Sequence, residues 1–297
     1  GYFCNTTNWD HKPYDQLLNE TKEITTFCDE NNWDSIWYTE HHFNHEGMES
    51  CTNPLMMGVD AAARTKQIRI GQACNVITFH NPIRLAEDIA LLDQLSGGRV
   101  DVGIGRGIYG REAINMNKEA DLKDQAKNFR LFDESLTIMK KAWTEKFFSH
   151  KGEFYNYPTP GFNWQHDMSP PNEEFLDTKT NEIKKISIVP KPKQQPHPPI
   201  WQVVDGARSI EWAAQNGLNT IMWIPTVKAL KNRFEIYRDA KSKAENRDVP
   251  LGEGISLVRD MFVAETMEEA EKLAGEYIIN YMKWVCHWRG LGNHMDP

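Results

Sequence analysis

The chain has 297 residues, of which 40% are hydrophobic, and this length allows one large domain or two ordinary ones. Its formal net charge of −8 argues against a general surface for nucleic acid or for anionic membranes. No apolar run approaches the roughly 18 residues that a membrane-spanning helix needs.

The cysteines and the start of the chain indicate a compartment. The five cysteines include no Cys-x-x-Cys pair and no dense framework, so they fit free thiols in a reducing environment. The first residues lack the basic and apolar regions of a signal peptide. We therefore expect a cytoplasmic protein.

The first part of the chain alternates between strand and helix patterns. Apolar and amphipathic runs predict, in order, a strand at 2–5, a helix at 14–31, a strand at 35–40, a helix at 53–65 and a strand at 68–76. Such an order calls for a parallel sheet.

The next helix is marked at both ends. Asn81 can cap it, Pro82 suits its first turn, and the Gly97-Gly98 pair supplies left-handed residues that end it. A short strand at 100–104 follows. The glycine-rich loop after that strand carries Arg106, which offers a fixed cation where the backbone can approach a ligand closely.

That loop has the spacing of a dinucleotide-binding turn. Gly105, Gly107 and Gly110 spell G-x-G-x-x-G after a strand, but the motif also needs a helix that starts at once and another strand within about 30 residues. We expect residues 111–125 to be a polar loop, and the next strand comes only at residue 200. The pattern therefore disfavours a nicotinamide site. The alternative that these glycines only form a turn remains.

A helix at 125–143 precedes the least regular part of the chain. Residues 148–199 mix proline, asparagine, aromatic and charged residues without a sustained period. We expect a long excursion over the mouth of the barrel, because loops of this length are usually functional or partly disordered. A substrate lid and a mobile insertion both fit.

Alternation then resumes to the end of the chain. The predicted elements are a strand at 200–204, a helix at 207–216, a strand at 219–223, a helix at 226–246, a strand at 254–263 and a helix at 267–287. Seven strands and seven helices indicate an α/β fold: a single (β/α)8 TIM-type barrel domain over 1–297. We expect its eighth βα unit to lie outside this sequence.

In such a barrel the ligand site forms at the carboxyl ends of the strands. Glu40, His41 and His45 follow the second strand and resemble metal ligands, but no further ligands follow other strands. We therefore expect no metal. His41 is either an acid/base catalyst or a satisfied structural histidine.

Three segments resemble the luciferase-like flavin monooxygenases. They are EHHF at 40–43, NPIRLAEDIALLDQLSGGRVDVGIGRG at 81–107 and WQVVDGARSIEWAAQNG at 201–217. The first indicates the branch of bacterial luciferase α chains, which are alkanal monooxygenases. The resemblance implies a (β/α)8 barrel that holds reduced FMN at the strand ends.

The resemblance also implies roles for individual residues. His41 matches the family's catalytic histidine and Glu40 its neighbouring acid. From their adjacency we expect Glu40 to orient the His41 imidazole or to adjust its basicity. The residues expected to bind the cofactor are Ala73 and Cys74, a pair often joined by a cis peptide against the flavin ring, Arg106 on the phosphate, Tyr109, and Asp205, Gly206 and Ser209 in the phosphate turn. Aromatic walls of the substrate pocket are expected at Phe3, Trp9, Phe43, Phe79 and Trp223.

Two positions depart from the luciferase branch. Gly105 stands where that branch has a reactive cysteine, and Asp205-Gly206 replaces a Glu-Ser pair. These departures argue against light emission and against a long-chain aldehyde substrate, but they do not affect flavin use.

The resulting hypothesis is a two-component monooxygenase. It would use reduced FMN and O2 on a small apolar aldehyde, ketone or sulfur compound, with a separate NAD(P)H:flavin reductase. The resemblance implies a homo- or heterodimer formed through helices 53–65 and 82–95. The alternatives are a deazaflavin (F420)-dependent oxidoreductase of the same fold and a non-catalytic partner subunit.

Overall fold

A parallel sheet forms the centre of the computed structural model, which describes residues 1–223 and 226–289. Its strands lie in the order β1 (Tyr2–Cys4), β2 (Ser35–Tyr38), β3 (Arg69–Gln72), β5 (Val100–Gly105), β8 (Ile200–Val204), β9 (Asn219–Trp223) and β10 (Ile255–Val258). The sheet curves into a barrel, and β1 and β10 stand at the two ends of its strand order. The barrel is therefore nearly closed. The predicted parallel barrel of seven strands is confirmed.

The third predicted strand is interrupted. Residues 68–76 form β3 and a short strand β4 (Asn75–Val76), which pairs with β5. Between them lies a cis peptide bond from Ala73 to Cys74, as the resemblance implies. The 3-10 turn η1 (Ile77–Phe79) follows β4.

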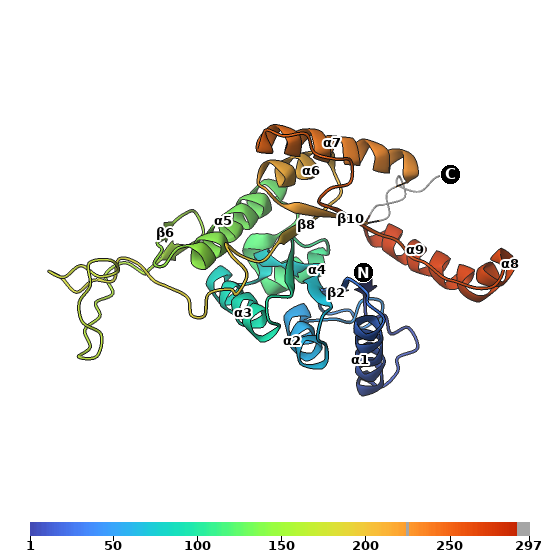
Figure 1. The fold of residues 1–297 in the computed structure, drawn as a ribbon, viewed down its shortest axis with the longest axis horizontal. Coiled ribbons are helices and arrows are strands. Elements are labelled where there is room, and N and C mark those ends of the chain that lie inside the picture. The colour runs from blue at the N-terminus through green and yellow to red at the C-terminus, as the bar shows by residue number, and fades with distance from the viewer. Residues whose placement is uncertain (224–225, 290–297) are drawn as a thin grey trace.

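Helices cover the outside of the sheet (Figure 1). They are α1 (Tyr14–Glu30), α2 (Pro54–Arg64), α3 (Pro82–Leu95), α5 (Gln125–Thr144), α6 (Ala207–Gln215) and α7 (Val227–Glu245). Asn81 accepts hydrogen bonds from the N–H groups of Ile83 and Arg84, so the predicted cap of α3 is confirmed. No helix among residues 1–223 and 226–289 combines the length and the apolar character needed to cross a membrane.

The main hydrophobic core lies between these helices and the sheet. All six residues of β5 are buried, which a strand covered on both faces requires. On the outer side Phe132 and Trp143 of α5 pack into the same core, and the Trp143 indole N–H donates to the Ala86 carbonyl. The central strand that carries the glycine-rich loop is therefore held rigidly.

The predicted polar loop at 111–125 is wrong. A short helix, α4 (Gly110–Met116), begins where the glycine-rich loop ends, and the 3-10 turn η2 (Lys118–Ala120) follows it. The helix is too short for a periodic apolar pattern, and it is anchored by the burial of Ala113 and Glu112. Its stability comes from tertiary contacts, which the local sequence does not display.

The C-terminal part also differs from the expectation. The strand β10 is shorter than predicted, and helix 267–287 is a succession of α8 (Met267–Ala270), a π-helical turn η3 (Glu271–Gly275) and α9 (Glu276–Arg289). In Figure 1 these helices extend away from the barrel near the N-terminus. The side chain of Tyr281 nevertheless reaches the barrel mouth, as described below.

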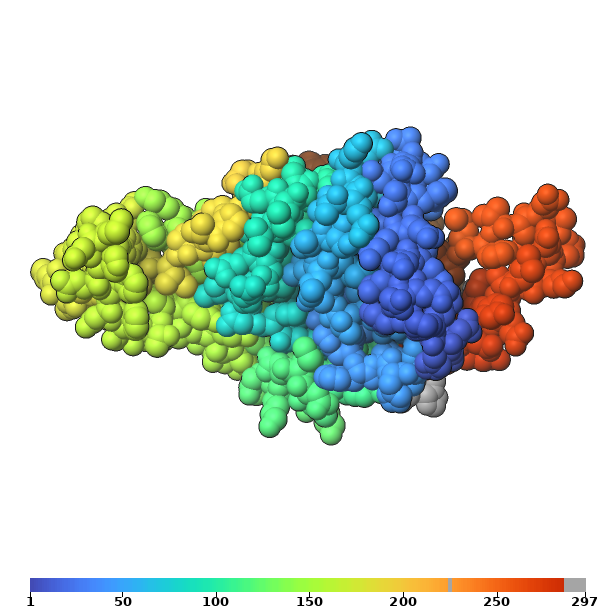
Figure 2. Space-filling model, turned by 90° about the horizontal axis from the view of Figure 1, so that it is seen from below, coloured from blue at the N-terminus to red at the C-terminus, as the bar shows by residue number. Residues whose placement is uncertain are grey.

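The excursion does not lie over the barrel mouth. It contains one antiparallel hairpin, β6 (His150–Lys151) with β7 (Asn156–Tyr157), and a few isolated bridges. Figures 1 and 2 show it as an arm that projects from the barrel at the end opposite α8 and α9. The Glu134 carboxylate holds its base by accepting the N–H groups of Glu153, Phe154 and Tyr155.

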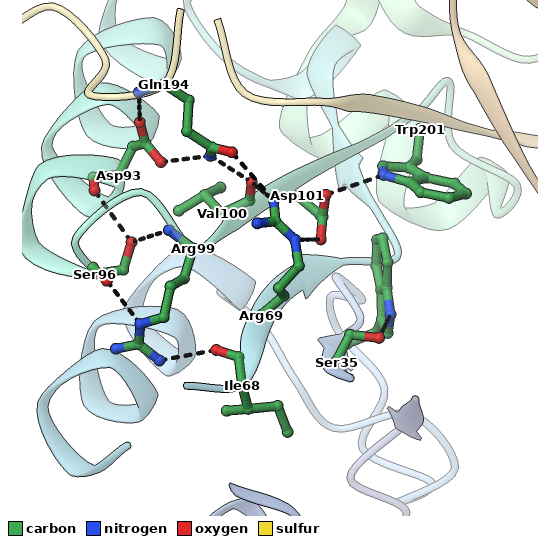
Figure 3. A network of polar contacts seen from close by, with 11 residues as sticks. Ser35, Ile68, Arg69, Asp93, Ser96, Arg99, Val100, Asp101, Gln194 and Trp201 are labelled. Atoms are coloured by element: carbon green, nitrogen blue, oxygen red, sulfur yellow. Dashed lines mark hydrogen bonds and ion pairs between the residues drawn. The ribbon is translucent and has the colours of Figure 1, made fainter. Parts of the chain in front are cut away.

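A polar network ties the end of this excursion to the amino ends of the strands (Figure 3). The fully buried Asp93 of α3 accepts the backbone N–H of Gln194 at 2.8 Å and its amide at 2.7 Å. Gln194 also donates to the Val100 carbonyl, and Arg69 makes two hydrogen bonds to Asp101. This face lies opposite the strand ends where barrels bind ligands, so we assign it to stability.

Asp93→Ala should therefore lower the free energy of unfolding by about 1–3 kcal/mol, because it removes the acceptor of the half-buried Gln194 backbone N–H and of one of its two amide hydrogens. Urea denaturation measures the change. Asp88→Ala on the same helix is the matched control, because the exposed Asp88–Arg84 pair is worth at most about 1 kcal/mol. Equal losses in the two variants would show that the network does not hold the excursion.

Candidate active site

A cavity of about 420 Å³ lies at the carboxyl ends of the strands. Its lining includes most of the residues that the sequence singled out: Phe3, Glu40, His41, Ala73, Cys74, Arg106, Asp205, Gly206, Ser209 and Trp223. No residue of the excursion 148–199 lines it. One pocket thus brings together the predicted acid/base residue and the predicted anion site, and the expected lid is not part of its wall.

Four predicted contact residues do not line this cavity. Trp9 and Phe43 are about half exposed, and Phe79 packs with Val76 and Ala113 in a small core cluster behind the glycine-rich loop. The Tyr109 ring lies 5.4 Å from the His41 ring and its hydroxyl donates to Glu49. Tyr109 therefore supports His41 from outside the lining.

His41 lies between two buried carboxylates. Its Nδ1 is 3.3 Å from Glu112 Oε1, and its Nε2 is 3.6 Å from Glu49 Oε2. Its backbone N–H donates to the Cys51 carbonyl at 2.8 Å, which fixes the chain at the exit of β2. The imidazole is thus oriented by side chains that come from a loop and from α4.

Glu40 does not orient His41, which corrects the expectation from their adjacency. Its carboxylate accepts hydrogen bonds from the Val76 N–H at 2.7 Å and contacts the Nε2 atoms of His42 at 3.0 Å and His80 at 2.8 Å. Successive side chains of an extended chain point to opposite sides, so neighbours in sequence diverge here.

Glu40 and His80 shift each other's titration. Burial acts to raise the pKa of Glu40, but the hydrogen bonds from His42 and His80 bring this pKa below its ordinary value. Burial acts to lower the pKa of His80, but the hydrogen bond and the charge of Glu40 bring it above its ordinary value. The charged pair is therefore favoured in the folded chain.

This pair gives a pH-dependent prediction. His80 contributes fully to the free energy of unfolding below the pKa of a histidine in the unfolded chain, about 6.5. This contribution is lost as the pH rises through the higher pKa of the folded chain. The contribution of Glu40 is complete above the unfolded glutamate pKa, about 4.3, and is lost as the pH falls through the lower folded value. Urea denaturation of His80→Asn should show the largest loss between about pH 4.5 and 6.5.

The exposed His45 supplies the control for that experiment. Its pair with Glu46 is largely solvent-exposed, so His45→Asn should change stability little at any pH. A loss in His80→Asn that stays constant from pH 5 to about 9 would contradict the pairing, because neutral histidine cannot contribute its charge.

At another part of the cavity Arg106 provides a cation. Its guanidinium donates to the Asn128 amide oxygen at 3.3 Å and lies over the Phe129 ring, and it has no ion-pair partner among the described residues. Burial lowers the pKa of Arg106, and the nearby charge of Arg208 lowers it further. Arg106 lines the cavity and the exposed Arg208 acts on it from outside the lining, so the two positive charges favour an anion here.

The turn after β8 adds backbone donors to this cation. Gly206 precedes α6 without a side-chain cap, and Ser209 folds its hydroxyl back onto the Gly206 carbonyl. The first N–H groups of a helix have no partner within the helix, so they attract an anion. The Asp205 carboxylate pairs with Arg233 at 3.0 Å, so Asp205 serves this turn through its backbone.

Polar atoms without partners line the cavity between these two parts. Thr39 Oγ1 and Gln202 Oε1 are buried and have no hydrogen-bond partner among the described residues, and Asn5 Oδ1 is also unpaired. Buried polar groups are normally satisfied, so these atoms point to a ligand with polar edges. A phosphate-bearing ring compound fits this set of donors and acceptors.

Several of these residues were not predicted from the sequence. Glu112 was missed because α4 was expected to be a loop, and Glu49 lies in an irregular segment. Tyr281 of α9 accepts a hydrogen bond from Asn5 and packs on Trp223, so α9 contributes to the wall between β1 and β9. Arg208 had one usable signal, because it stands in the first turn of the helix after the Asp205-Gly206 turn.

Histidine, cysteine and carboxylate side chains are the groups that hold metal ions in proteins. In the part of the chain that the structure describes, no three or more histidine, cysteine, aspartate or glutamate side chains are arranged to hold a metal ion. Cys4, Cys28, Cys51 and Cys74 form no disulfide bond.

A comparison with family models gives one match. The luciferase-like monooxygenase model matches residues 1–171, which is more than half of the chain. The matched region includes β1 to β5 and α4, and it contains His41, Arg106 and Glu112.

Curated relatives and solved structures agree with this match. The oxygenase component of a flavin-dependent trigonelline monooxygenase from Acinetobacter baylyi is 29% identical over 273 residues, 92% of this chain and 66% of that protein. An alkanal monooxygenase alpha chain from Photorhabdus laumondii is 28% identical over 225 residues, 75% of this chain and 54% of that one. This chain thus spans between half and two thirds of these relatives.

The fold has a solved counterpart. The oxygenating constituent of 3,6-diketocamphane monooxygenase from Pseudomonas putida, in complex with FMN, superposes with a TM-score of 0.80 at 22% identity. The match covers 99% of this chain and 77% of that one.

Proposed function

This chain belongs to the family of luciferase-like monooxygenases, and we propose that it is the oxygenase of a two-component system that uses reduced FMN and O2. The observation that carries the proposal is a single cavity lined by both His41 and Arg106. Its substrate is a small apolar aldehyde, ketone or sulfur compound.

The anion site is the proposed position of the FMN phosphate. Arg106, Arg208 and the N–H groups at the start of α6 supply charge and oriented donors there. The unpaired atoms of Asn5, Thr39 and Gln202 are available to the polar edge of the ring system. The Ala73–Cys74 pair borders the same cavity.

His41 is the proposed acid/base residue. Reduced FMN, when bound, supplies the electrons that activate O2. An imidazole can act as a proton donor or as a proton acceptor, and this one lies in the lining of the same cavity. Phe3, Trp223 and Tyr281 present apolar surface to the cavity and restrict water, which would otherwise discharge the activated oxygen.

The proposed system needs a source of reduced flavin. The glycine-rich loop leads into α4 and lacks a second strand close by, so this chain shows no nicotinamide site of the βαβ type among its described residues. The first relative above is named an oxygenase component. We therefore propose a separate NAD(P)H:flavin reductase and a cytoplasmic setting.

The proposed dimer uses α2 and α3. Exposed apolar side chains on these helices include Met56 and Val59 of α2 and Leu91 and Leu95 of α3. These side chains would be covered in a homo- or heterodimer formed through this face.

Anaerobic titration with reduced FMN tests the cofactor, and oxygen consumption with a flavin reductase and a panel of small carbonyl and sulfur compounds tests the reaction. Saturable binding and substrate-dependent incorporation of one oxygen atom are expected. Turnover without O2 on a reduced deazaflavin would instead establish the F420 alternative, and failure to bind any reduced flavin would contradict both.

A further inference from the structure

Glu112 is a buried carboxylate that joins two parts of the site. It stands in the first turn of α4, and 1% of the residue is exposed. Its Oε1 atom accepts the backbone N–H of His42 at 2.8 Å and lies 3.3 Å from His41 Nδ1. One oxygen atom therefore contacts both the main chain after β2 and the imidazole.

The hydrogen bonds that Glu112 Oε1 accepts determine which nitrogen of the His41 imidazole carries the hydrogen. Since the His42 N–H donates to Oε1, this oxygen acts as an acceptor, and His41 Nδ1 must then carry the hydrogen. In the neutral ring Nε2 is left without one. Nε2 lies 3.6 Å from Glu49 Oε2, on the side where Tyr109 donates its hydroxyl to Glu49.

Glu112 also connects His41 to the anion site. The helix α4 begins at Gly110, directly after the loop that carries Arg106, and Gly107 in this loop has a φ of 82°. This positive φ favours glycine, so the loop takes one defined path from Arg106 to α4. The orientation of His41 is thereby tied to the segment that we propose to hold the cofactor phosphate.

We propose that Glu112 is the positioning residue of His41. It sets the Nδ1–H tautomer and the direction of the ring, and it does so from the helix that follows the phosphate loop. This inference rests on the proposed function, in which His41 handles the proton.

The tautomer can be measured without turnover. Nitrogen NMR of the chain labelled at histidine, with the His41 signal assigned from His41→Gln, should show the hydrogen on Nδ1 in the neutral ring. Glu112→Ala should shift His41 toward a mixture of tautomers, and Glu112→Gln should retain Nδ1–H because its amide oxygen is still an acceptor. An Nε2–H ring in the wild type, or an unchanged signal in Glu112→Ala, would overturn the proposal.

A double-mutant cycle supplies the kinetic test. Glu112→Ala should lower kcat about tenfold with a smaller change in KM, and Glu112→Gln should restore most of the rate. In the His41→Ala background Glu112→Ala should cause no further loss, because the residue acts through the imidazole. An equal loss in both backgrounds would assign Glu112 a role independent of His41.

Glu46→Gln is the matched control. Glu46 also anchors α4, through two hydrogen bonds from Arg111 on the surface at 3.0 and 3.1 Å. The variant changes one surface contact of α4 and leaves the contacts of Glu112 with His41 and His42 in place, so the His41 NMR signal and kcat should stay those of the wild type. If no substrate is turned over, the proposed function fails, while the NMR result still decides the role of Glu112.

Discussion

Replacing His41 with alanine should lower turnover about 10²–10⁴-fold, while the affinity for reduced FMN changes little. An imidazole can act both as a proton donor and as a proton acceptor, and His41 is the histidine in the lining of the cavity. The anion site lies on other elements, so cofactor binding does not depend on this side chain. Stopped-flow and steady-state oxygen consumption measure the first effect, and anaerobic titration measures the second.

The structure calls for two companion variants. Alanine at this position leaves Glu49 and Glu112 facing a space that the imidazole filled, so His41→Gln, which fills much of it, separates loss of chemistry from loss of folding. His42→Ala should instead lower the unfolding temperature more than turnover, because His42 contacts the buried Glu40. A His41→Ala chain that turns over normally, or one that does not fold when His41→Gln is active, would make the residue structural.

Features with local causes were predictable from the sequence. Asn81, Pro82 and Gly97 act within one turn of α3, so its limits follow from neighbours in the chain. The alternation of apolar runs sufficed for the seven strands and their parallel order. Because strand ends meet at one rim, His41 and Arg106 were also expected in one site, and the structure places both in its lining.

Features that depend on contacts through space were not predictable. Glu40 is adjacent to His41 in sequence, yet the carboxylates that contact the imidazole are Glu49 and Glu112. The second of these lies 71 residues away and on a helix too short to show a period. A periodic sequence pattern reveals only those elements that bury a regular face. It does not reveal α4, because a few individual contacts hold this helix.

The position of the excursion 148–199 also depends on contacts through space, so it was not predictable from the sequence. Its composition predicted a break in regular structure but contained no information on direction, because no periodic face shows what it packs against. The structure anchors it to Glu134 of α5 and, through Gln194, to Asp93 of α3, and both helices lie on the outside of the barrel. Aromatic side chains were similarly expected in the pocket from their type and their place after a strand, and Trp9 and Phe43 are half exposed instead.

Arg106→Ala should weaken FMN binding roughly ten- to a hundredfold and leave riboflavin binding almost unchanged. A charge-assisted hydrogen bond is worth about 1.5–3 kcal/mol, which corresponds to this range of affinity. The guanidinium is partly buried and has no ion-pair partner among the described residues, so its charge is available to a phosphate. Riboflavin lacks the phosphate and therefore does not use this contact.

Two further variants make the comparison sharp. Arg208→Ala should weaken FMN binding less than Arg106→Ala, because Arg208 is exposed and its charge is screened by solvent. Arg84→Ala, which removes an exposed arginine of α3 paired with Asp88, should not affect either flavin. Raising the salt concentration should reduce the difference between wild type and Arg208→Ala first. If Arg106→Ala weakens FMN and riboflavin equally, the arginine supports the loop through Asn128 and Phe129, and the phosphate lies elsewhere.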